Sequence, residues 1–83
     1  MSNITIYTTA YCPYCVQAKR LLNSKSINFE EIAVDNDPQK RAEMMQKSRR
    51  NTVPQIFNNE QHIGDCSEIF DFERDGSLDS LLA

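Results

Sequence analysis

A pair of cysteines at the junction between a strand and a helix constrains this chain more than any other feature. Residues 4–8 are rich in β-branched and aromatic side chains and predict a strand with two usable faces. Cys12-Pro13-Tyr14-Cys15 follows shortly after it. Pro13 suits the first position of a helix, because its φ is fixed near the helical value and its missing N–H would be unpaired there anyway. The pattern predicts a reactive dithiol.

The two thiols are expected to differ in exposure and in role. A helix that begins near Pro13 aims its unpaired N–H groups and the positive end of its dipole at the Cys12 sulfur, which favours the thiolate. The apolar residues of this helix recur at helical spacing to about Lys25, and Cys15 begins the apolar stripe. We therefore predict that Cys12 is the exposed nucleophile and Cys15 the shielded thiol.

The next segments predict an α/β fold. Ile27 through Val34 is expected to form a second strand, and the helix between the two strands is long enough for a parallel crossover. Asp37-Pro38 is typical of an N-cap and a first helical position, so a helix is predicted over roughly Gln39 to Ser48. We expect Met44 and Met45 to fill the core under this helix.

The last third predicts a hairpin and two helices. Residues 53–57 and 61–63 are two short apolar segments joined by a turn-forming stretch, which indicates a β-hairpin with His62 exposed on it. Asp65 and Glu68 have capping-box spacing at the start of a helix. Gly76-Ser77 is expected to end that helix and to cap a short final one that carries Leu78, Leu81 and Leu82.

Composition limits the class of protein. A chain of 83 residues fits one domain spanning 1–83, and 40% hydrophobic residues suit a compact fold. A formal charge of -3 provides no general attraction for nucleic acid or for an anionic membrane surface. Neither a signal-like N-terminus nor a membrane-spanning apolar run is present in the sequence, so the cytoplasm is the expected location. Three cysteines make an odd number, which favours a cycling dithiol in a reducing compartment over a permanent disulfide framework.

Together these motifs resemble the dithiol glutaredoxins, particularly the short bacterial glutaredoxin 3 type. The resemblance rests on Cys12-Pro13-Tyr14-Cys15 near the N-terminus, on Thr52-Val53-Pro54 before the hairpin, and on Gly64 ahead of another helix, and it covers almost the whole chain. It implies a thioredoxin-like fold with a central mixed four-stranded sheet flanked by helices. It further implies a cis peptide bond between Val53 and Pro54.

The same resemblance implies a glutathione-dependent thiol–disulfide oxidoreductase. Such an enzyme uses glutathione as co-substrate, holds no bound cofactor or metal, acts as a monomer, and reduces glutathionylated or disulfide-containing proteins through Cys12 and Cys15. The Val53 backbone is then expected to pair with the tripeptide, and the helix N-terminus near Cys66-Ser67 to hold its γ-glutamyl carboxylate. The implied glutathione-binding residues are Tyr14, Thr52, Val53, Pro54, Gly64, Asp65, Cys66 and Ser67.

Two positions depart from the glutaredoxin pattern. A lysine often stands shortly before the cysteine motif, where this chain has Thr8-Thr9-Ala10-Tyr11, and a second glycine often follows Gly64, where this chain has Asp65. Asp65 adds a negative charge near a site for an anion. We hypothesise that Arg49 and Arg50 supply the missing positive charge.

Alternative functions follow from the same residues. One is a glutaredoxin-like electron donor to ribonucleotide reductase that thioredoxin reductase reduces, although the tryptophan-bearing C-terminal signature of that class is missing. Another is a structural or interaction module in which Cys12, Cys15, His62 and Cys66 bind zinc. Iron–sulfur-bridging glutaredoxins rank low, because Pro13 stiffens the segment that would have to accommodate a cluster. Cys66 by itself is interpreted as a buried small residue.

Overall fold

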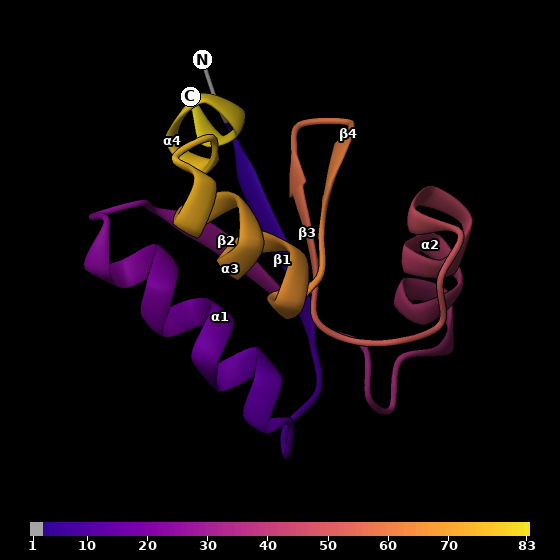
Figure 1. Cartoon of the computed structure of the whole chain (residues 1–83). Coiled ribbons are helices and arrows are strands. Elements are labelled where there is room, and N and C mark those ends of the chain that lie inside the picture. Colours follow the sequence, from indigo (N-terminus) through magenta and orange to yellow (C-terminus); the bar gives the residue numbers. More distant parts are fainter. Residues whose placement is uncertain (1–2) are drawn as a thin grey trace.

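In the computed structural model of the protein, residues 3–83 are described, and Met1 and Ser2 lie outside the described part (Figure 1). This range contains four strands and four helices, in the order expected from the sequence. They are β1 (Ile4–Thr8), α1 (Pro13–Ser24), β2 (Phe29–Ala33), α2 (Pro38–Ser48), β3 (Gln55–Asn58), β4 (Gln61–Gly64), α3 (Cys66–Asp75) and α4 (Leu78–Leu82).

The strands form one mixed sheet in the order β2-β1-β3-β4. Strand β1 lies inside the sheet, where Ile6 faces Glu31 of β2 in a parallel pair and Ile56 of β3 in an antiparallel pair. Strands β3 and β4 form the predicted hairpin, with an irregular register between Ile56 and Phe57. The parallel β1–α1–β2 unit, the mixed four-stranded sheet and the thioredoxin-like arrangement are therefore confirmed.

Two apolar clusters cover the two faces of the sheet. Helices α1, α3 and α4 lie on one face and α2 lies on the other (Figure 1). The alternation along β1 explains the division, because Ile4 and Ile6 belong to the larger cluster and Tyr7 belongs to the smaller one under α2. The larger cluster consists of Ile4, Ile6, Ala18, Leu22, Ile56, Ile63, Cys66, Ile69, Leu78 and Leu82.

The structure corrects three local expectations. Strand β2 begins at Phe29, because Ser26 has a positive φ of 58° and the N–H of Ile27 donates to the carbonyl of Leu22 at 3.0 Å, which ends α1 instead of extending the strand. Ser77 does not cap α4 with its side chain; its hydroxyl donates to Asp75 at 2.5 Å. Met45 is 42% exposed, so only Met44 fills the core.

The ends of the helices follow the capping signals in the sequence. The Asp37 carboxylate accepts from the N–H of Lys40 at 3.1 Å, and Pro38 occupies the first turn of α2. Asp65 and Glu68 form the predicted capping box at the start of α3, and Gly76 ends that helix with a φ of 84°. Among the helices of residues 3–83, none is both long and apolar enough to cross a membrane.

Candidate active site

Cys12 is the N-cap of α1. Its sulfur accepts a hydrogen bond from the N–H of Cys15 at 3.1 Å, so one of the unpaired N–H groups of the first turn points at it. The sulfur also lies 3.9 Å from the carbonyl oxygen of Val53, to which the thiol donates. The side chain is partly exposed. The sulfur therefore lies at the positive end of the α1 dipole, beside an N–H donor, and its partial exposure leaves it accessible to a disulfide.

Cys15 is the shielded thiol, as the sequence predicts. It is only 1% exposed and packs at the start of the apolar face of α1. Burial, and then the hydrogen bond with the Cys12 sulfur, raise the pKa of the Cys15 thiol to about 12. At neutral pH the Cys15 thiol is therefore protonated while Cys12 is reduced.

A groove of about 460 Å³ lies beside the dithiol. Its size falls in the range of small-molecule sites. One wall is the loop that precedes β3, where the Val53–Pro54 peptide bond is cis as expected. The other wall is the first turn of α3. The lining residues are Tyr14, Thr52, Val53, Pro54, Asp65, Cys66 and Ser67.

These seven residues all belong to the set implied by the resemblance, and Gly64 is the eighth. Gly64 does not line the groove but shapes its edge. Its φ is +149°, and a Cβ at this position would lie 2.8 Å from the Cβ of Glu68 and 3.0 Å from one carboxylate oxygen of Glu68. The absence of a side chain therefore lets Glu68 fold back against the end of β4, where it completes the capping box.

The backbone of α3 offers donors to the groove. The first turn of a helix leaves its leading N–H groups without intrahelical partners. Within residues 3–83 the N–H groups of Cys66 and Ser67 have no protein acceptor, whereas the N–H of Glu68 donates to Asp65 at 3.0 Å. Two free N–H groups and the positive end of a helix dipole suit a carboxylate.

Cys66 is a buried groove residue rather than a second nucleophile. The residue is 5% exposed, and burial raises the pKa of its thiol, with smaller contributions from Asp65 and Cys12. A thiol held in its neutral form is a poor nucleophile at neutral pH. The interpretation of Cys66 as a buried small residue is confirmed.

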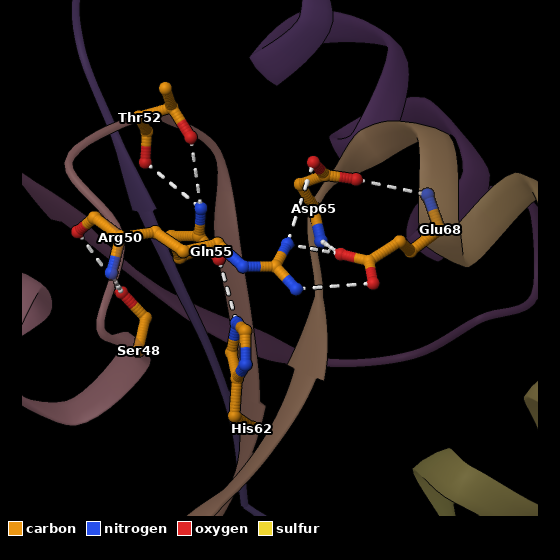
Figure 2. A network of polar contacts seen from close by, with 7 residues as sticks. All are labelled: Ser48, Arg50, Thr52, Gln55, His62, Asp65 and Glu68. Carbon is orange, nitrogen blue, oxygen red and sulfur yellow. Dashed lines mark hydrogen bonds and ion pairs between the residues drawn. The ribbon is translucent and has the colours of Figure 1, made fainter.

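A network of polar side chains behind the loop was missed by the sequence analysis (Figure 2). Gln55 is fully buried, and its amide nitrogen donates to the carbonyl and the hydroxyl of Thr52 at 3.1 and 3.2 Å. Its amide oxygen lies 2.7 Å from Nε2 of His62. The predicted exposed position of His62 is therefore wrong. Burial, and then the charge of Arg50, lower the pKa of His62, so the ring is neutral at pH 7 and donates from Nε2.

The position of His62 also bears on the zinc alternative. His62 directs Nε2 at Gln55 and packs on Phe57, with ring centroids 5.0 Å apart. In the part of the chain that the structure describes, no three His, Cys, Asp or Glu residues gather in a way that could hold a metal ion. The geometry gives the zinc module no support.

Arg50 is the charged part of the network. Its guanidinium donates to both carboxylate oxygens of Glu68, at 3.2 Å for the Nη2 bond, and lies 3.6 Å from the carboxylate of Asp65 (Figure 2). Its backbone N–H donates to Ser48 at 3.1 Å, which fixes the start of the loop to α2. Arg49 is the C-cap of α2 with a φ of 60°, and its exposed side chain has no ion-pair partner within residues 3–83.

The fold and the site together define a class. A sulfur at the N-terminus of α1, a shielded second thiol one turn later and a cis-proline loop beside them are the parts of a thioredoxin-like dithiol oxidoreductase.

Comparisons with known proteins define the family. The Glutaredoxin family model matches residues 4–63. Glutaredoxin 3 of Escherichia coli (strain K12) is 49% identical over 82 residues, which cover 99% of each chain. The solution structure of a glutaredoxin from Brucella melitensis superposes with a TM-score of 0.86 at 48% identity, covering 99% of this chain and 89% of that one.

A buckwheat glutaredoxin–glutathione complex also superposes, with a TM-score of 0.87 at 27% identity over 98% of this chain and 76% of that one. This chain belongs to the glutaredoxin family, and its activity is glutathione-dependent thiol–disulfide exchange. The resemblance inferred from the sequence is confirmed.

Proposed function

We propose that this glutaredoxin reduces mixed disulfides between proteins and glutathione through the Cys12 sulfur alone. The Cys12 thiolate attacks the glutathione sulfur of the mixed disulfide. The old S–S bond breaks, a Cys12–glutathione disulfide forms, and the protein thiolate leaves and takes up a proton. The thiolate of a second glutathione then attacks the glutathione sulfur on Cys12, which forms glutathione disulfide and returns Cys12 as a thiolate. Overall, the mixed disulfide and one free glutathione are converted into the reduced protein and glutathione disulfide.

The groove supports the binding of glutathione with its sulfur next to Cys12. Val53 presents its backbone at the wall nearest the Cys12 sulfur, where an extended peptide can pair with it as a short added strand. The free N–H groups of Cys66 and Ser67 suit the γ-glutamyl carboxylate. Tyr14 and Thr52 flank the tripeptide between these two anchors. The buckwheat glutaredoxin, which has the same fold, was solved as a complex with glutathione.

A second route reduces protein disulfides and requires Cys15. Cys12 attacks the protein disulfide and becomes linked to one protein sulfur. Cys15 then loses its proton and attacks the Cys12 sulfur, which releases the reduced protein and leaves a Cys12–Cys15 disulfide. Two glutathione molecules reduce that disulfide in turn. The burial of Cys15 supports this order, because a shielded thiol cannot reach the substrate first.

The observation that carries the proposal is the placement of seven expected residues around one groove beside Cys12. The partners are glutathionylated or disulfide-containing proteins. A dithiol that must be reduced in every cycle needs a reducing pool, and this supports the cytoplasm as the site of action.

The test is a coupled assay with a glutathione–peptide mixed disulfide as substrate. With glutathione and glutathione reductase present, NADPH oxidation is expected to depend on the protein and to saturate with substrate. With thioredoxin reductase in place of both, the rate is expected to stay at the background level. A reversed pattern would contradict the proposed reductant.

A further inference from the structure

The anion site of the groove lies next to two carboxylates of this chain. Asp65 lines the groove, and Glu68 lies one helical turn into α3, with its side chain folded back onto the backbone N–H of Asp65 at 3.1 Å. The hydrogen bond from Arg50 lowers the pKa of the Glu68 carboxyl, so Glu68 is charged at neutral pH. Two negative charges at this position oppose the binding of any carboxylate at the start of α3.

Arg50 is the cation that faces both of them. Its guanidinium binds the Glu68 carboxylate through two nitrogens and approaches Asp65 to 3.6 Å (Figure 2). The three side chains are 34 to 38% exposed, so water screens the ion pairs of Arg50 with Asp65 and Glu68. These ion pairs therefore contribute little to the free energy of unfolding. Its field still reaches the groove, because the Debye length at physiological salt is about 8 Å.

We propose that Arg50 is a positioning residue for glutathione affinity: it offsets one of the two negative charges of Asp65 and Glu68 and thereby keeps the N-terminus of α3 able to accept the γ-glutamyl carboxylate. The inference rests on the proposed glutathione site. It assigns Arg50 a role different from direct contact with the ligand, and it explains how the chain tolerates Asp65 where a glycine often stands. Without Arg50, the formal charge of the trio changes from -1 to -2.

The experiment measures KM and kcat for a glutathione–peptide mixed disulfide in four proteins. Arg50→Met is expected to raise KM about fivefold at low ionic strength, with kcat changed less than twofold, because only binding is affected. In 0.5 M NaCl the rise is expected to fall below twofold, because the Debye length shrinks to roughly 4 Å. Arg50→Met with Glu68→Gln is expected to bring KM back to within twofold of the original value.

Two features of the design isolate charge from structure. Gln is compatible with the third helical position of a capping box, so Glu68→Gln removes charge while preserving that motif. Arg74→Met is the matched control, because Arg74 forms an ion pair with Asp71 on the exposed side of the same helix and is expected to leave KM unchanged. If Arg50→Met does not fold, Arg50→Gln takes its place, and Arg50→Lys is expected to retain the original KM within twofold.

The outcomes separate this inference from the proposed function. An unchanged KM for Arg50→Met overturns the inference. So does a KM rise that persists in high salt or that Glu68→Gln does not reverse, since such a rise indicates direct contact between Arg50 and glutathione. An original protein that does not turn over the mixed disulfide at all contradicts the proposed function instead.

Discussion

Gly64 offers the sharpest test of the packing at the edge of the groove. In Gly64→Ala the new Cβ meets Glu68 at 2.8 Å while the backbone keeps a φ of +149°. Backbone strain from positive φ costs about 1–2 kcal/mol. Displacement of Glu68 also removes a capping-box bond worth about 1 kcal/mol and an exposed ion pair worth at most about 1 kcal/mol. We expect the free energy of unfolding to fall by about 2–4 kcal/mol.

Gly76→Ala is the matched control, because Gly76 also has a positive φ, +84°, but has no atom within 4 Å of a Cβ built on it. This variant carries only the conformational cost, about 1 kcal/mol. Urea unfolding of both variants compares their free energies of unfolding. In thermal unfolding, the Tm of Gly64→Ala is expected to be roughly 10 °C lower than that of Gly76→Ala. If the two variants lose equal stability, the steric argument for Gly64 is refuted.

Two further predictions concern the pH dependence and the helix caps. Because burial raises the pKa of Cys15, its neutral thiol favours the folded state fully below about pH 9, and this contribution is lost as pH rises toward 12. The difference in unfolding free energy between the original protein and Cys15→Ala should therefore shrink from pH 8 to pH 10.5 in urea titrations, and a constant difference would contradict the assigned burial. Asp37→Ala removes the cap of α2, away from the groove, and should cost about 1 kcal/mol by urea unfolding with KM unchanged. A KM change would show that α2 communicates with the site.

The sequence predicts most of the fold, because the relevant signals are local. The β-branched run at residues 4–8, Pro13 after Cys12 and the pairing of Asp65 with Glu68 each specify one element through short-range chemistry, and the structure contains all three. The predicted start of β2 at Ile27 is wrong, because the local signal there was misleading. Ile27 has the side chain of a strand residue, but its N–H donates a hydrogen bond to the last turn of α1. The positive φ of Ser26 makes this hydrogen bond possible, and a serine does not indicate a positive φ in the way that a glycine or an asparagine does.

Only part of the site could be predicted from the sequence. The dithiol and the groove residues follow from motifs, so they could be named in advance. The network behind them depends on contacts between distant segments, in which Gln55 reaches His62 across the hairpin and Arg50 reaches Glu68 from another loop. The sequence did indicate an unfavourable negative charge at Asp65, near a site for an anion, and a cation at Arg50. Only the fold shows that the cation binds the carboxylates.

The central claim is that one sulfur, Cys12, performs the exchange while Cys15 serves only the dithiol route. The most direct measurement compares Cys12→Ser and Cys15→Ser in the reduction of a glutathione–peptide mixed disulfide by glutathione. Cys15→Ser is expected to keep the rate within a few-fold of the original protein, and Cys12→Ser is expected to reduce it to background. An active Cys12→Ser protein beside an inactive Cys15→Ser protein would contradict the account.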